Sequence, residues 1–211
     1  MVRRGVGTIE TVNALVNDNY ALIRNVAKYM LNDKGLTNAE FLRASYRRFI
    51  RLRPFVSNRS MVKDTYTDYI RYKYRYEDYP KRMAMIGVQC DNQLNRSQVK
   101  NSLSFVAKAC SFIDESKGTK FEVARDNTMC RQILKNLLTI HYEKTSHTNE
   151  KRTPLRHIFQ YSFEHMKDIN KSTNSQSYSK PASPKSSLIL DLYGEFDRDI
   201  LLLNNLLNMR L

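Results

Sequence analysis

Three arginines of this chain are spaced so that they would form a row along one side of a helix. Arg43, Arg47 and Arg51 follow one another at intervals of four residues, and such residues are neighbours on the surface of an α-helix. Like charges at this spacing repel one another and slightly weaken an isolated helix, unless nearby acids or a bound anion compensate. Two interpretations remain open: a solvated basic face, or a ridge that binds an anion.

The segment around this row carries a large excess of positive charge. Residues 43–82 contain twelve Lys and Arg but four Asp and Glu, an excess of eight charges within a chain of net charge +14. Such an excess attracts nucleic acid, acidic lipid or an acidic protein, without deciding between them. The residues that we predict to contact a partner are Arg43, Tyr46, Arg47, Arg48, Arg51, Lys73 and Arg75.

Tyrosines alternate with the basic residues over 66–79, where six of them occur. Tyrosine beside Arg or Lys can stack on bases and hold phosphates in single-stranded nucleic acid. Val62, Tyr66, Tyr69 and Lys73, however, also follow the spacing of a buried helix face, which favours a role in packing. No recognised signature of a nucleic-acid-binding domain accompanies them, so direct binding of nucleic acid remains the alternative function.

Residue patterns typical of catalysis are missing from the sequence. There is no glycine loop for phosphate and no serine flanked by glycines. The four histidines lack metal-ligand spacing with Cys, Asp or Glu: they are His141, His147, His157 and His165. The odd number of cysteines, Cys90, Cys110 and Cys130, predicts partly buried free thiols in a reducing compartment. We therefore expect no catalytic residue, no metal, no cofactor and no enzymatic activity.

The elements that would position these residues are helical. Gly and Pro are scarce, at 6 and 5 residues, and apolar residues recur at helical spacing. Thr37 and Glu40 form a capping-box pattern, and Pro54 should end the helix that follows. A helix opened by Ser97 and a second capping box at 119–122 are also expected. The expected helices are 19–32, 38–53, 59–78, 97–113, 120–144, a short one at 157–166 and one at 196–209, with irregular structure over 83–95.

The sequence thus predicts an all-α fold: a helical bundle of about five helices, a flexible linker and a C-terminal helix that docks. We divide the chain into a flexible N-terminus (1–18), the bundle (19–144), a polar, partly disordered linker (145–186) and a C-terminal helical segment (187–211). No apolar run is long enough to span a membrane, and no secretory signal is visible. Arg3 and Arg4 hint at a mitochondrial presequence, although Glu10 and Asp18 are atypical of one.

Two long segments carry a family resemblance: SYRRFIRLRPFVSNRSMVKDTYTDYIRYKYRYEDY (45–79) and FEVARDNTMCRQILKNLLTIHYEK (121–144). Both are similar to the increased recombination centers protein 19 family of budding yeasts. The terminal segment FDRDILLLNNLLNMRL resembles the same family in its general character. The resemblance implies roles in sporulation and in maintenance of mitochondrial DNA, within a pathway of genome integrity. It favours a mitochondrial location, with nucleus or cytoplasm as the alternative, and it transfers no catalytic residue.

A second resemblance concerns mechanism. Ser45-Tyr46-Arg47, with the later segment YIRYKYR, resembles the opening of Leu-Tyr-Arg-motif proteins, which are small mitochondrial adaptors of three helices. Those adaptors bind the acidic acyl carrier protein, whose acyl chain enters their core. Ser45 stands where the motif has leucine, whereas Tyr46 and Arg47 match it. The resemblance implies an adaptor in which Arg48 and Arg51 supply a basic surface for such a partner.

Overall fold

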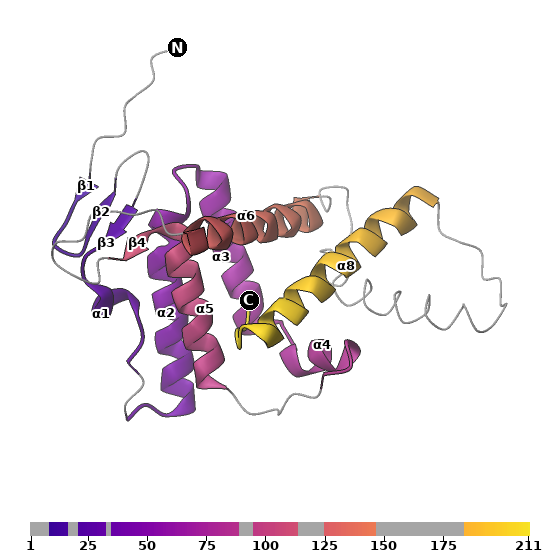
Figure 1. Ribbon diagram of the computed structural model, residues 1–211, viewed down its shortest axis with the longest axis horizontal. Helices are drawn as coiled ribbons and strands as arrows, with labels where there is room; N and C mark the ends of the chain where they lie inside the picture. The colour runs from indigo at the N-terminus through magenta and orange to yellow at the C-terminus, as the bar shows by residue number, and fades with distance from the viewer. Residues whose placement is uncertain (1–8, 17–20, 33–34, 89–94, 114–124, 147–183) are drawn as a thin grey trace, which may run out of the picture. The chain divides into compact units, whose positions relative to one another are not determined.

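The computed structural model describes residues 9–16, 21–32, 35–88, 95–113, 125–146 and 184–211. The chain forms two compact units. The first unit comprises residues 1–77, 93–139 and 208–210, and the second comprises residues 78–92, 140–207 and 211. Both units are mainly helical (Figure 1), so the predicted all-α class is confirmed, with a small sheet that was not foreseen.

The helix that carries the arginine row is α2 (Asn38–Val56). Its predicted capping box is present: the Thr37 hydroxyl accepts the Glu40 N–H at 3.3 Å, and the Glu40 carboxylate accepts the Thr37 N–H at 2.9 Å. The prediction that the helix stops before Pro54 is wrong, because α2 continues to Val56. Pro54 lies in the last turn, where a missing N–H and the proline ring disturb few remaining helical hydrogen bonds.

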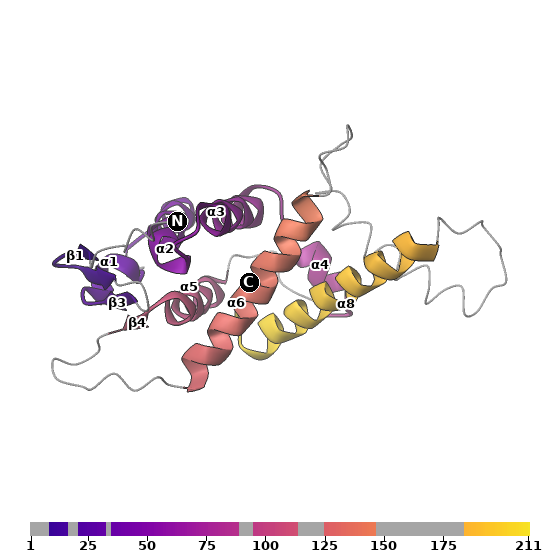
Figure 2. The ribbon, with the colours of Figure 1, turned by 90° about the horizontal axis from the view of Figure 1, so that it is seen from above.

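Helix α2 packs against two others, α3 (Ser60–Arg75) and α5 (Arg96–Cys110), and the three lie side by side in both views (Figures 1 and 2). The buried face of α2 presents Phe41, Phe49 and Leu52. The Tyr66 side chain of α3 is fully buried, and its hydroxyl donates to the Phe49 carbonyl at 2.8 Å. A buried phenol with a satisfied hydroxyl contributes to packing rather than to base stacking.

The remaining tyrosines of α3 follow the same pattern. Tyr69 and Tyr72 are also buried, whereas Tyr76, just after the helix, is 57% exposed. The interpretation of the tyrosine series as mainly core is therefore confirmed. Helix α3 ends at Arg75, three residues before the predicted end. A separate short helix, α4 (Tyr79–Met85), then occupies part of the stretch expected to be irregular.

A small four-stranded sheet replaces part of the predicted helix 19–32. Its strands are β1 (Ile9–Glu10), β2 (Ala14–Val16), β3 (Ala21–Ile23) and β4 (Phe112–Ile113), in the order β1-β2-β3-β4. The first three are antiparallel, and β4 adds in parallel to β3, with Leu22 opposite Phe112. Only a short helix, α1 (Val26–Tyr29), remains of the predicted one.

The prediction of a helix over 19–32 is wrong for a physical reason. All three residues of β3 are buried, and a short, continuous apolar run fits a central strand as well as a helix face. β3 is central because β4, some ninety residues later, pairs with its second edge.

Helix α5 ends at Cys110, before the predicted residue 113, because residues 112–113 form strand β4. Helix α5 is capped by Asn95, whose side chain accepts the Ser97 and Gln98 N–H groups, and not by Ser97.

The second unit contains α4, the end of α6 (Arg125–Ser146) and α8 (Pro184–Leu206). Tyr79, Met83 and Leu201 form its buried apolar cluster. Helix α8 begins twelve residues before the predicted start at 196, although most of the polar linker lies outside the described residues. The predicted capping box at 119–122 and the helix at 157–166 also lie outside them.

The described cysteines differ in their environment. Cys110 is buried at the end of α5, and Cys130 of α6 is partly buried. Burial raises the pKa of the Cys110 thiol to about 12, although Arg131 opposes the shift. Because the reactive species is the thiolate, Cys110 should be inert in the folded chain.

We expect iodoacetamide at pH 8 to alkylate Cys130 at least about tenfold faster than Cys110 in the native protein, with equal rates in urea. The buried, protonated Cys110 thiol also contributes to the free energy of unfolding. Because its folded-state pKa is raised, this contribution is fully present at pH values below the ordinary thiol pKa. It is lost as pH rises toward 12. Peptide mass mapping measures each thiol, and rapid native labelling of Cys110 would show that the end of α5 opens.

Candidate partner-binding face

The exposed side of α2 presents the arginine row, by which we mean Arg43, Arg47 and Arg51. All three side chains are exposed, while Phe41, Ser45, Phe49 and Leu52 of the same helix are buried against the core. A rise of 1.5 Å per residue separates successive members by about 6 Å along the axis. The row therefore follows the exposed side of α2 and turns by about 40° about the axis at each step, because four residues exceed one turn of 3.6.

No carboxylate neutralises this row within the described part of the chain. Arg43 and Arg47 form no ion pair there, whereas the nearby Arg53 pairs with Asp64 at 2.8 Å. The pKa of the Glu40 carboxyl is lowered first by hydrogen bonds from Thr37, and Arg43 adds only a smaller effect. Within the described residues, the interaction of Arg43 with Glu40 is thus the one electrostatic contact that relates the row to a carboxylate.

Two arginines in the second half of α2 contact α1. Arg48 and Arg51 both donate to the backbone carbonyl of Lys28, Arg51 at 3.3 Å. The pKa of the Arg48 guanidinium is lowered by burial and, to a smaller extent, by the charge of Arg51. A neutral carbonyl oxygen thus holds two cations close together.

The residues of the Ser45-Tyr46-Arg47 motif point in different directions. Ser45 is fully buried; its hydroxyl donates to the Leu42 carbonyl at 2.9 Å and accepts the Tyr74 hydroxyl at 2.8 Å. Burial raises the pKa of Tyr74 to about 12. Tyr46 is partly buried, and its ring packs edge-on against the Tyr74 ring, with 5.3 Å between the two ring centroids. Ser45 and Tyr46 therefore support the helix, and Arg47 faces solvent.

The two residues of α3 that we predicted to contact a partner, Lys73 and Arg75, also differ in exposure. Arg75 is exposed, but the Lys73 side chain is only 7% exposed and pairs with Glu77. The structure thus gathers Arg43, Arg47 and Arg51 on one exposed helix side, and it turns Lys73 inward.

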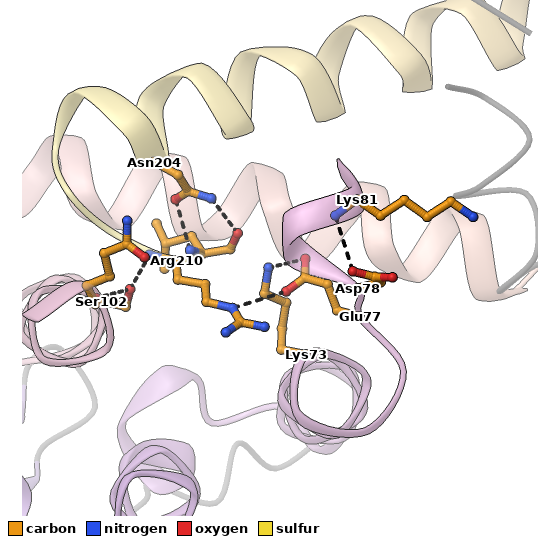
Figure 3. A network of polar contacts seen from close by, with 9 residues as sticks. Lys73, Glu77, Asp78, Lys81, Ser102, Asn204 and Arg210 are labelled. Atoms are coloured by element: carbon orange, nitrogen blue, oxygen red, sulfur yellow. Dashed lines mark hydrogen bonds and ion pairs between the residues drawn. The ribbon is translucent and has the colours of Figure 1, made fainter. Parts of the chain in front are cut away.

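Sequence reasoning missed a buried network in the first unit (Figure 3). The fully buried Glu77 carboxylate meets Lys73, and Arg210 Nε lies 3.8 Å from Glu77 Oε2. The Arg210 backbone N–H donates to the Ser102 hydroxyl at 2.7 Å, and the Asn101 amide donates to the Asn208 carbonyl at 3.0 Å. The only sequence signal was an acid inside a strongly basic segment.

A second buried network, within the second unit, was also missed. Lys144 of α6 donates to the Asp197 carboxylate of α8 at 2.8 Å, and Arg82 of α4 lies 3.9 Å from it. His141 of α6 is also buried, at 3% exposure.

Among the described residues, no three His, Cys, Asp or Glu side chains are grouped so that they could hold a metal ion. The helices of this part of the chain include none with the length and apolar character needed to cross a bilayer.

Comparison with known proteins identifies the family. Residues 9–211 match the model for increased recombination centres protein 19. The chain is 39% identical to the increased recombination centers protein 19 of Zygosaccharomyces rouxii, over 97% of this chain and 98% of the relative. It is 38% identical to that of Vanderwaltozyma polyspora, over 96% of each chain, and 34% identical to that of Saccharomyces cerevisiae, over 97% of each.

No solved structure matches the chain. The family model covers nearly the whole chain, including the small sheet, α2 and the residues of both buried networks. The name shared by these relatives refers to increased recombination centers. The chain therefore belongs to the increased recombination centers protein 19 family.

Proposed function

We propose that this chain is a non-catalytic helical adaptor that acts in genome integrity, specifically in maintenance of mitochondrial DNA and in sporulation. In this proposal it works in the mitochondrion and binds an acidic protein, similar to acyl carrier protein, through the arginine row. One observation carries the proposal: Arg43, Arg47 and Arg51 share the exposed side of α2, and no carboxylate of the described chain pairs with them.

The spacing of the row suits an acidic helix. Its members are about 6 Å apart along the axis, which is also the separation of carboxylates four residues apart on a partner helix. Guanidinium groups pair with carboxylates through charge-assisted hydrogen bonds, and exposed complementary charge accelerates association. Packing of the opposite face of α2 against the core fixes the helix that carries the row.

The alternative, direct binding of nucleic acid, has less support. Single-stranded binding surfaces combine basic residues with exposed aromatic rings, but Tyr66, Tyr69 and Tyr72 are buried in this chain. Phosphate contacts by the exposed arginines would remain. They would give binding that weakens with salt at a slope of about 0.9 per phosphate.

Reversing Arg43 and Arg47 tests the proposal. Binding of purified acyl carrier protein to Arg43→Glu/Arg47→Glu should weaken at least about tenfold, because attraction becomes repulsion at two contacts. Arg59→Glu/Arg71→Glu is the matched control, since it makes the same charge change at exposed positions near α3. Isothermal titration calorimetry measures both, and circular dichroism checks the fold.

Three outcomes contradict the proposed adaptor. They are no binding by the wild-type chain, binding that survives the Arg43/Arg47 reversal, and equal losses in the control. A single-stranded oligonucleotide that binds with a steep salt dependence, and is released by the same reversal, would favour the alternative. In yeast cells, the reversed chain should also fail to maintain mitochondrial DNA, scored as respiration-deficient colonies.

A further inference from the structure

Two arginines of the first unit converge on one neutral atom. Arg48 and Arg51 both donate through Nη1 to the Lys28 carbonyl. A guanidinium carries five N–H groups, so each arginine keeps most of its donors for another acceptor. Residues three apart on a helix lie on the same side, which leaves both side chains facing the junction of α1 and α2.

The charge at this junction is uncompensated in the described residues. Neither arginine pairs with a carboxylate there, and Lys28, whose carbonyl they share, is itself exposed. The pKa of Arg48 is lowered by burial and then by Arg51, so the two cations oppose one another. An anion bound to both would remove this repulsion and use the remaining donors.

The convergence distinguishes this pair from the rest of the arginine row. Arg43 and Arg47 are separate cations along α2 and each matches one carboxylate. Arg48 and Arg51, in contrast, donate to the same carbonyl oxygen, which brings their two charges close together. A phosphate monoester carries about −1.5 to −2 charges at pH 7, while a nucleic-acid phosphate carries one. Paired guanidinium groups also match the planar, bidentate geometry that phosphate oxygens accept.

We propose that Arg48 and Arg51 form a clamp for a phosphate monoester on the acidic protein that the arginine row binds. This inference rests on the proposed function and adds the chemistry of one contact. Arg51 belongs to both sets, so the phosphate lies at the C-terminal end of the row. Phosphorylation of the partner then strengthens binding without changing the contacts of Arg43 and Arg47.

The test compares two fluorescent, glutamate-rich peptides that differ only in a central phosphoserine or serine. The full-length chain should bind the phosphoserine peptide at least about tenfold more tightly, the equivalent of about one charge-assisted contact. Arg48→Gln/Arg51→Gln should remove this preference, so that the two peptides bind with affinities equal within about twofold. Because Arg51 also belongs to the arginine row, both peptides should bind this variant more weakly than the wild-type chain. Arg59→Gln/Arg71→Gln, with the same loss of charge, should retain the preference.

Because Arg48 and Arg51 also tether α1, Arg51→Gln alone provides a second variant that keeps the Arg48 hydrogen bond. It should lose most of the preference with an unchanged circular dichroism spectrum. Equal affinity of the wild-type chain for both peptides, or a preference that survives the double substitution, overturns the clamp. A single-stranded oligonucleotide that displaces the phosphopeptide at a lower concentration than the unlabelled phosphopeptide does would also overturn the clamp.

The two proposals fail in different ways. If both peptides bind equally and Arg43→Glu/Arg47→Glu releases both, the acidic-partner function stands and the clamp is wrong. If that reversal leaves both peptides bound, the proposed function is wrong whatever the phosphate preference.

Discussion

Replacing Glu77 with alanine is expected to lower the free energy of unfolding of the first unit by about 3–5 kcal/mol. The Glu77 side chain is fully buried, the Lys73 side chain is 7% exposed, and Arg210 approaches the same carboxylate. Removing the carboxylate leaves the Lys73 ammonium in a buried site without its main countercharge. Urea unfolding followed by circular dichroism measures the loss, and a lower denaturation midpoint is expected.

Asp64→Ala is the matched control, because it also removes one acid that pairs with a cation of the same unit. The Arg53 and Asp64 side chains are 40% and 69% exposed. Exposed pairs contribute little, so the loss should stay below about 1 kcal/mol. Equal losses in the two variants would show that burial of Glu77 does not set its contribution.

Replacing Asp197 with alanine should destabilise the second unit by a similar amount, about 3–5 kcal/mol. Asp197 accepts from Lys144, whose side chain is 2% exposed, and faces Arg82. Burial lowers the pKa of Lys144, and Asp197 opposes that shift. Without Asp197 the Lys144 pKa should fall further, because desolvation and the repulsion of Arg82 then act without the opposing carboxylate.

The pH dependence of the Asp197→Ala chain follows from this shift. The folded-state pKa of Lys144 lies below its ordinary value, so the unfolded chain binds more protons in the alkaline range. Stability should therefore rise with pH until the ordinary lysine pKa is reached. Asp199→Ala, an exposed position of the same helix, is the control. Similar midpoints and pH profiles for both substitutions would contradict a buried ion pair.

How far the sequence predicts the fold depends on the range of the interactions. The start of α2 was predictable because Thr37 and Glu40 complete a capping box within four residues. Strand β3 was not, because its burial depends on β4, which is distant in sequence. The extension of α8 to Pro184 was not predicted for another reason: its first four residues are a proline and three polar residues, and the three apolar residues that follow, 188–190, are consecutive and not spaced at a helical period.

The same distinction applies to the candidate site. The exposed arginine row follows from helical spacing alone, and so did the expectation that the tyrosines of α3 mainly pack. The inward turn of Lys73 depends on Glu77, four residues away, and on the burial of both side chains. The contact of Lys144 with Asp197 spans 53 residues. No local pattern indicates such a pairing, because burial decides which charges meet.

Residues 208–210 belong to the first unit although most of the second unit precedes them in sequence. The bond between Asn101 and Asn208 joins positions 107 residues apart. At ribosomal elongation rates, the chain between them takes roughly 5–20 s to make. During that interval the nascent first unit keeps Ser102 and Glu77 without their contacts to Arg210. The cell must hold this incomplete domain until its last segment emerges, which is a period when chaperones and proteases compete for it.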